Sequence, residues 1–381
     1  MPERDPEPLD SAAEDPGHPE RRPGAGRPRR LLLIGTFLLL VLIWGTTWAA
    51  IRLGLQGGVP PGGETAGAGG GLQGGIPPWT GAALRFGIGS VLLLALAPFF
   101  GVKLGQSAAE RRLWLINTVC TFSISYGVLY WAEQWVPSGL AAVIFAIFPL
   151  CTALFAHPAV PGERLNPGGL AGILVGFAGL AVIFSEDFAL LGGRQVAVAA
   201  AVLVISPVAA ALGNVSTKKW GHDVHPLSIA AVPMGFAALL LGAVAMVVER
   251  GRPIDFNLHS VGALLYLAVF GSAVTFTLYF WLLRHVSVTS LSFLNYATPV
   301  VAVLVGTLGL GEPLTGRTVA GALLVVAGVA VALRAKAAAH RGHDLHPAKP
   351  RAAHRAVPPR GTGLRYAVSS DENSVTEEER A

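Results

Sequence analysis

The side chains that could do chemistry in this sequence are the few ionisable residues within or beside its long apolar runs. Arg85 lies inside one such run, and Glu133 occupies a short polar break between two others. An ionised side chain at the centre of a bilayer costs about 2.5–3.5 kcal/mol on insertion scales, so each is a functional hypothesis by default. Two interpretations of Arg85 are open. In the functional interpretation, its guanidinium attracts a substrate carboxylate or phosphate or pairs with Glu133. In the structural one, it reaches the outer membrane interface or bonds helix-end carbonyls.

Glu133 is also open to two interpretations. It is a solvated loop acid or an acid stabilised at a helix N-terminus, or it carries a proton or forms a gate pair with Arg85. The second interpretation matters because the sequence offers no Asp or His deep within an apolar run. The central histidines all fall in loops or near the ends of the runs: His157, His222, His225, His259 and His285. Proton coupling is therefore open but is not indicated by the sequence.

A substrate pathway through a membrane would be lined by polar and aromatic residues, which lipid-facing surfaces avoid. Hydrogen bonds between helices and an aromatic belt at the interface are the structural alternatives. Two prolines in mid-run, Pro149 and Pro299, would each free a carbonyl and bend a helix. Besides these prolines, Arg85 and Glu133, the predicted pathway residues are Trp44, Thr47, Trp48, Tyr126, Tyr130, Asn214, Tyr279, Asn295 and Tyr296.

The elements that must position these residues are membrane helices. Charged residues make up only 13% of the 381 residues and hydrophobic residues 52%, where about 25% charged is usual in soluble proteins. Crossing the hydrocarbon takes roughly 20 apolar residues. Ten runs meet this requirement and predict an all-α protein with ten transmembrane helices, at 31–51, 79–100, 113–131, 135–157, 167–185, 195–215, 226–248, 259–282, 286–310 and 316–334.

Both tails are polar and are predicted to be disordered: residues 1–30 and 335–381. Eight cations lie just before the first run or at or just after the end of the last one. This bias predicts that both termini of a multi-pass plasma-membrane protein lie in the cytoplasm. The cations are Arg21, Arg22, Arg27, Arg29, Arg30, Arg334, Lys336 and Arg341. The net charge of +5 comes from these segments and does not indicate binding to nucleic acid. Two cysteines inside apolar runs exclude a secreted disulfide scaffold.

The chain contains an internal repeat. Trp131 precedes Pro149 by 18 residues, and Trp281 precedes Pro299 by 18. Each proline is followed by a glutamate, 14 residues later in the first copy and 13 in the second, and each glutamate by two glycines at matching distances. These marks are Glu163, Gly172 and Gly179 in the first copy and Glu312, Gly321 and Gly328 in the second. The copies are predicted at 31–185 and 195–334, with five helices each.

An odd number of helices makes the second copy cross the membrane in the opposite sense. Inverted repeats of this kind are typical of secondary transporters, whose halves move around a site near the membrane midplane. Glu163 and Glu312 precede Asn166-Pro167 and Thr315-Gly316, which are residue types that begin helices. For these two glutamates we expect a structural role in the turns.

Several segments resemble the EamA-type transporters of the drug/metabolite transporter superfamily. They are Ile43–Trp48, Leu84–Phe86 and Tyr130–Ala142, together with the proline–glutamate–glycine pattern of both halves. The resemblance covers residues 31–334 and implies ten helices, cytoplasmic termini and export of small metabolites, amino acids or drugs without ATP hydrolysis. The long tails and the glycine-rich stretch from Pro60 to Gly75 depart from the family pattern.

The sequence thus predicts a secondary transporter that exports a small molecule by alternating access and needs neither cofactor nor metal. A membrane enzyme is the first rival, but the helices hold no HExxH motif, acidic pair or Ser/His/Asp set. A membrane sensor or a structural membrane protein that acts through its tails is the second. The expected partners are a small-molecule substrate and the lipid bilayer. Small-residue stripes at 167–185 and 316–334 suit either an internal scaffold or a homodimer interface.

Overall fold

A computed structural model describes residues 26–57, 75–136, 138–183, 185, 194–301 and 315–345. All regular elements in these ranges are helical. Within them, eight helical stretches are long and apolar enough to cross a membrane, and α7 (Pro167–Ile183) is a shorter apolar helix. The prediction of an all-helical membrane protein is therefore confirmed. The count of ten helices is not, because residues 302–314, which include the second part of the predicted ninth helix and Glu312, lie outside the described residues.

The first half of the chain follows the predicted order with two local changes. The run at 135–157 divides after Phe145, because Pro149 lacks the N–H that would bond the Phe145 carbonyl. The run at 113–131 contains a π-helical segment. The elements are α1 (Gly26–Gln56), α2 (Pro78–Leu96), a 3₁₀ turn (Ala97–Phe100), α3 (Ala108–Ile116), the first π-helical segment (Asn117–Ser125), α4 (Tyr126–Ala132), α5 (Ser138–Phe145), α6 (Phe148–Ala159) and α7.

The second half repeats this plan. Its elements are α8 (Arg194–Leu203), α9 (Ile205–Trp220), α10 (Pro226–Val248), α11 (Leu258–Ala268), the second π-helical segment (Val269–Val274), α12 (Thr275–His285), α13 (Val288–Ser292), a helix over 294–301, and α15 (Gly316–Leu345). The last helix continues past its predicted end at 334. The chain divides into units at Ala338, and the described part of the second unit, 339–345, continues α15.

The two π-helical segments occupy equivalent positions of the repeat. Moving Asn117–Ser125 by the 150 residues that separate Trp131 from Trp281 places it over Val269–Val274. A π-turn is a short irregularity that leaves a backbone carbonyl without its usual partner and often lies at a functional site. Its appearance in both halves is structural evidence for the repeat beyond the sequence marks.

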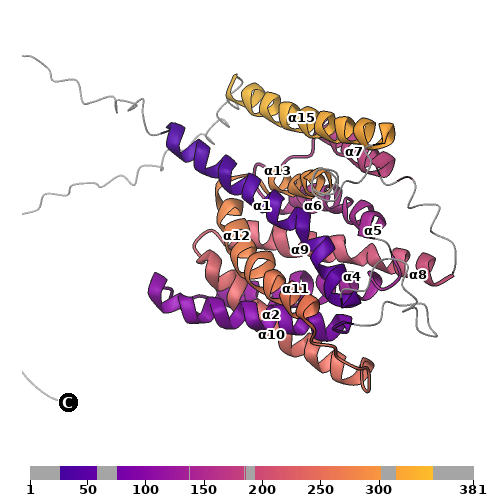
Figure 1. Cartoon of the computed structure of the whole chain (residues 1–381). Helices are drawn as coiled ribbons and strands as arrows, with labels where there is room; N and C mark the ends of the chain where they lie inside the picture. Colours follow the sequence, from indigo (N-terminus) through magenta and orange to yellow (C-terminus); the bar gives the residue numbers. More distant parts are fainter. Residues whose placement is uncertain are drawn as a thin grey trace, which may run out of the picture. The chain divides into compact units, whose positions relative to one another are not determined.

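Buried carboxylates tie the two halves together at helix starts. Glu249, at the end of α10, accepts hydrogen bonds from the Trp79 and Thr80 backbone nitrogens at 2.8 and 2.9 Å and from the Thr80 hydroxyl at 2.6 Å. Glu110, at the start of α3, accepts one from the Ser228 hydroxyl at 2.5 Å. α2 and α10, which run side by side (Figure 1), are thus each held at the first turn by a carboxylate from the other half.

Glu163 has the structural role that the sequence predicts, but it acts on a more distant helix than the turn beside it. Its carboxylate accepts hydrogen bonds from the Val288 backbone nitrogen at 2.8 Å and the Thr289 hydroxyl at 2.9 Å, at the start of α13. The neighbouring N-cap prediction is confirmed, because Asn166 accepts from the Gly169 nitrogen at 2.6 Å. Glu163 therefore connects the first half of the chain to the second.

The small-residue stripes bring α7 and α15 into backbone contact (Figure 1). A Cβ added at Gly172 would lie 2.5 Å from the Ala332 nitrogen, and one at Gly179 would lie 2.7 Å from the Gly321 carbonyl oxygen. Gly328 faces Gly176 in the same way. The stripes are therefore used within one chain, as the scaffold interpretation predicts. A homodimer interface stays a prediction.

Candidate functional site

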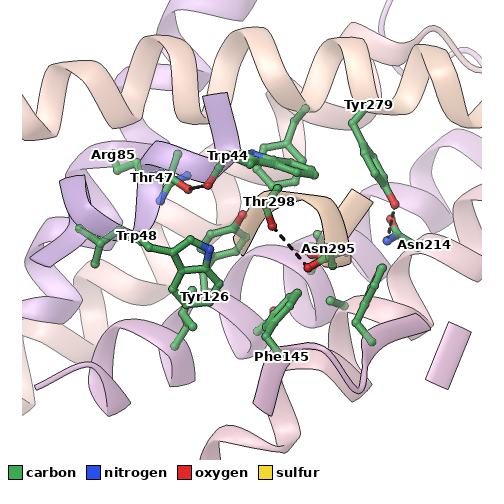
Figure 2. A pocket seen from close by; sticks show the side chains of 17 residues that line it. Trp44, Thr47, Trp48, Arg85, Tyr126, Phe145, Asn214, Tyr279, Asn295 and Thr298 are labelled. Carbon is green, nitrogen blue, oxygen red and sulfur yellow. Dashed lines mark hydrogen bonds between the residues drawn. The ribbon is translucent and has the colours of Figure 1, made fainter. Parts of the chain in front are cut away.

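A cavity lies among helices of both halves, and Figure 2 shows the side chains around it. It holds about 710 Å³ of space free of protein atoms, including the part open to solvent. The lining residues are Trp44, Thr47, Trp48, Ile51, Arg85, Thr121, Ser125, Tyr126, Leu129, Phe145, Phe148, Ala210, Asn214, Phe276, Tyr279, Asn295 and Thr298.

The lining comes largely from equivalent positions of the two repeats. Four pairs of lining residues are separated by the 150-residue repeat offset: Tyr126 and Phe276, Leu129 and Tyr279, Phe145 and Asn295, and Phe148 and Thr298. On the first helices of the two halves, Trp44 and Trp48 have the same four-residue spacing as Ala210 and Asn214. The cavity therefore lies where the two copies meet.

Equivalent positions carry different chemistry. Phe145 and Phe148 give the first half an apolar wall, whereas Asn295 and Thr298 give the second half a polar one. Arg85, seven residues after the proline that begins α2, corresponds to Pro233, seven residues after the proline that begins α10. The cavity is thus built from equivalent positions but has one cationic side.

Arg85 is held in place by hydrogen bonds to the second half. Its Nε donates to the Ser272 hydroxyl at 2.7 Å, and one terminal nitrogen donates to the Gly271 carbonyl at 2.8 Å. Both acceptors lie in the second π-helical segment, where the irregular turn makes a carbonyl available. The other terminal nitrogen donates to the Tyr130 hydroxyl at 3.3 Å. The side chain is 1% exposed, so it does not extend to the membrane interface as the structural alternative predicts.

No carboxylate neutralises Arg85 among the residues that the structure describes, because none lies within 4 Å of its guanidinium. Three aromatic rings surround it instead, with Tyr126 nearest at 5.0 Å from the guanidinium carbon to the ring centre. Aromatic faces attract a cation but replace a counter-ion only in part. The cavity therefore has a buried, positioned and uncompensated positive charge in its wall.

Glu133 lies close to this cation without touching it. The carboxyl group follows α4, is 3% exposed, and neither of its oxygens has a hydrogen-bond partner among the described residues. The favoured interpretation of Glu133 as a solvated loop acid is wrong. Burial raises the pKa of Glu133 to about 8, against the opposing effect of the charges of Arg52 and Arg85.

The side of the cavity away from Arg85 carries neutral hydrogen-bonding groups. Figure 2 shows Asn214 and Tyr279 there, with the Asn214 amide donating to the Tyr279 hydroxyl at 2.9 Å. The Thr298 hydroxyl lies 3.4 Å from the Asn295 carbonyl, which the missing N–H of Pro299 leaves free. Trp44 adds a buried indole N–H that has no hydrogen-bond partner among the described residues.

The structure brings eight predicted pathway residues to this one cavity: Trp44, Thr47, Trp48, Arg85, Tyr126, Asn214, Tyr279 and Asn295. Tyr130 and Glu133 are not among the lining residues, although Tyr130 bonds Arg85 and Glu133 interacts with its charge. Pro149 and Pro299 are buried next to the lining residues Phe148 and Thr298.

Tyr296 lies outside the cavity, in contrast to the prediction. Its ring packs over Gly176, and its hydroxyl donates to the Ile173 carbonyl of α7 at 2.9 Å. A tyrosine can satisfy its hydroxyl on a helix carbonyl wherever a glycine leaves room for the ring, so its type alone did not indicate its direction.

Nine lining residues are absent from the predicted pathway: Ile51, Thr121, Ser125, Leu129, Phe145, Phe148, Ala210, Phe276 and Thr298. Most are apolar and resemble lipid-facing residues in the sequence. Applying the 150-residue offset to Tyr126, Tyr279 and Asn295 would have identified Phe276, Leu129 and Phe145. Within the described residues, no cluster of His, Cys, Asp or Glu is suited to hold a metal ion.

Comparison with known proteins follows the same division of the chain. The model of the EamA-like transporter family matches residues 31–185 and 197–334. The chain belongs to the EamA-like transporter family. The inner membrane transporter YedA of Escherichia coli K12 is 31% identical over 328 residues, which cover 85% of this chain and 96% of YedA. The transporter YoaV of Bacillus subtilis is 25% identical, covering 76% and 92%.

A solved crystal structure has the same fold, with a TM-score of 0.65 at 21% identity over 81% of this chain and 98% of that chain. Family membership and the apolar helices together make this EamA protein a multi-pass membrane transporter. The cavity at the junction of its repeats is the candidate site for its substrate.

Proposed function

We propose that this transporter exports a small organic anion with an aromatic or apolar part by alternating access through the central cavity. Arg85 carries the proposal: it is a buried cation in the cavity wall, and no described carboxylate lies within 4 Å of it. A buried charge without a counter-ion is costly, and an anionic ligand would remove that cost. The ligand's acid group therefore contacts Arg85.

The rest of the lining supports the remaining features of the substrate. Aromatic side chains from both halves give flat apolar faces for a ring or hydrocarbon portion. The free indole N–H of Trp44 and the amide and hydroxyl of Asn295 and Thr298 provide hydrogen bonds for a polar linker. Hippurate, which combines a phenyl ring, an amide and a carboxylate, is a suitable probe.

Alternating access follows from the position of the cavity between two related halves. Inverted halves can exchange conformations and open the same site to either side. The cationic segments beside the first and last helices support cytoplasmic termini. Export is the direction that the family resemblance implies.

The test uses proteoliposomes loaded with labelled hippurate or with its neutral amide, hippuramide. We expect liposomes that contain the parent protein to release hippurate faster than protein-free liposomes. Arg85→Gln should lower the protein-dependent rate at least about tenfold, because a charged hydrogen bond contributes about 1.5–3 kcal/mol. Arg112→Gln is the matched control, since Arg112 is exposed and stacks on Trp220 away from the cavity.

Arg85→Gln must also accumulate in the membrane and elute as a single species, so that loss of fold is distinguished from loss of transport. Equal hippurate release by a folded Arg85→Gln variant and the parent would rule out the anion site. For the natural substrate, extracellular metabolites of cells lacking and overproducing the protein should be compared. Overproduction should enrich organic anions outside, and the Arg85→Gln variant should not.

A further inference from the structure

We infer that Glu133 is the proton-binding partner of this anion site: its carboxyl is neutral while an anion occupies Arg85, and it ionises and pairs with Arg85 when the anion leaves. This inference rests on the proposed function, because it concerns the same cavity. It adds a proton that binds with the anion in alkaline solution, where Glu133 is otherwise ionised, and so links substrate binding to pH.

The first observation is the surroundings of the carboxyl group. Only 3% of the surface of Glu133 is exposed. Neither carboxyl oxygen accepts a hydrogen bond from any described residue. An ionised carboxylate in such a place would lack both water and donors, whereas a neutral acid loses much less by burial. The structure with Arg85 and Glu133 apart therefore corresponds to neutral Glu133.

The second observation is the set of charges around Glu133. Arg52 from α1 and Arg85 from α2 are the cations that act on it, and Tyr130 from α4 is the titratable group that shares Arg85 with it. Two other charged groups at this end of the bundle have partners of their own. Glu249 binds the first turn of α2, and Arg252 donates to the Gln134 side chain at 3.2 Å.

The third observation is that two anions, the ligand carboxylate and ionised Glu133, compete for the single positive charge of Arg85. A ligand carboxylate reaches the guanidinium from the cavity, and Glu133 acts on it from the α4–α5 connection. When the ligand anion arrives, a proton from water joins a Glu133 oxygen and the ligand takes Arg85. No bond of the ligand breaks, and the charge of the site is unchanged. Where Glu133 is otherwise ionised, one anion and one proton therefore bind together.

Proton linkage gives a definite pH dependence. Below the pKa of Glu133 the acid is already neutral, so anion binding needs no additional proton and does not vary with pH. Above about pH 8 each binding event must take up a proton, and the affinity falls about tenfold for each further pH unit.

The experiment uses the full chain in lipid nanodiscs and measures hippurate binding by calorimetry in buffers of different ionisation enthalpy, which counts protons. We expect the parent protein to take up about one proton per hippurate at pH 9 and none at pH 6. Glu133→Gln, which imitates the neutral acid, should bind with the affinity that the parent has at pH 6 and take up no proton at either pH.

Asp223→Asn is the matched control, because Asp223 is an exposed carboxylate paired with His222 at the other end of α9. It should behave as the parent. Equal proton uptake by the parent and Glu133→Gln would overturn the inference and leave the anion site of the proposed function intact.

An infrared titration without ligand separates the two proposals if hippurate does not bind at any pH. The band of a protonated carboxylic acid should disappear near pH 8 in the parent and should be absent in Glu133→Gln. In Arg85→Gln it should persist to higher pH, because the ionised form has lost its cation. A parent spectrum without this band, or a titration that Arg85→Gln does not move, would overturn the pairing of Glu133 with Arg85.

Discussion

At the scale of single residues, the halves are joined by carboxylates that accept hydrogen bonds across the repeat boundary. Glu110, Glu163 and Glu249 are all buried, and each accepts a hydrogen bond from the first turn of a helix in the other half. The free N–H groups of a helix start favour an anion. A buried acid is thereby stabilised without a cation beside it.

Glu163→Gln tests this role. The amide can keep its oxygen on the Val288 nitrogen, but it loses the negative charge that favours a helix start, and its NH₂ group faces the Thr289 hydroxyl, which must then accept instead of donate. We expect a loss of about 1–3 kcal/mol, seen as a lower midpoint of thermal unfolding of the purified protein. Asp223→Asn should leave the midpoint unchanged, and an unchanged midpoint in Glu163→Gln would argue against the carboxylate contact.

Sequence reasoning located Arg85 and Glu133 but could not determine their surroundings. That both residues are unusual follows from their place beside apolar runs. Two of the three hydrogen-bond partners of Arg85, Gly271 and Ser272, lie 186 and 187 residues further along the chain. No spacing rule within one helix connects positions so far apart, so the cradle of Arg85 required the fold.

At the scale of elements, hydropathy identified the helices but not their internal irregularities. The runs at 113–131 and 259–282 both contain a π-helical segment that hydropathy does not reveal, because one extra residue in a turn leaves the average unchanged. The break before Pro149 was predictable from the missing N–H. In the predicted ninth helix the break falls at Phe293, six residues before Pro299, which lies within the helical residues 294–301.

The contact between α7 and α15 gives a prediction at this scale. Gly172→Ala adds a methyl group 2.5 Å from the Ala332 backbone nitrogen, so the helices must separate. Overpacking of this kind costs about 1–3 kcal/mol, and the thermal midpoint should fall. Gly262→Ala is the matched control on α11, since its added methyl meets nothing within 4 Å. Equal midpoints for the two variants would show that α7 and α15 are not in close contact.

At the scale of the whole molecule, the repeat predicts which loops face which side of the membrane. With both termini in the cytoplasm, the connection after α9 is inside and the connection after α10 is outside. Asp223 and Arg250 are exposed positions in these two connections. We expect an impermeant maleimide to label Arg250→Cys in intact cells, and Asp223→Cys only after permeabilisation.

The parent chain is the control for this labelling, because Cys120 is partly buried and Cys151 buried. Labelling of Asp223→Cys in intact cells would contradict the inverted arrangement of the two halves. It would also contradict alternating access about a shared cavity.

The unequal walls of the cavity have a kinetic consequence. Each half contributes its own surface to the cavity, Phe145 and Phe148 from the first and Asn295 and Thr298 from the second. When the halves exchange conformations, a ligand that enters from one side contacts the phenylalanine side chains first. A ligand that enters from the other side contacts the amide and hydroxyl groups first. The half-saturation concentrations measured from the two compartments should therefore differ. If carriage were uncoupled, the ratio of maximal rate to half-saturation would still be the same in both directions, since no carrier can create a gradient unaided.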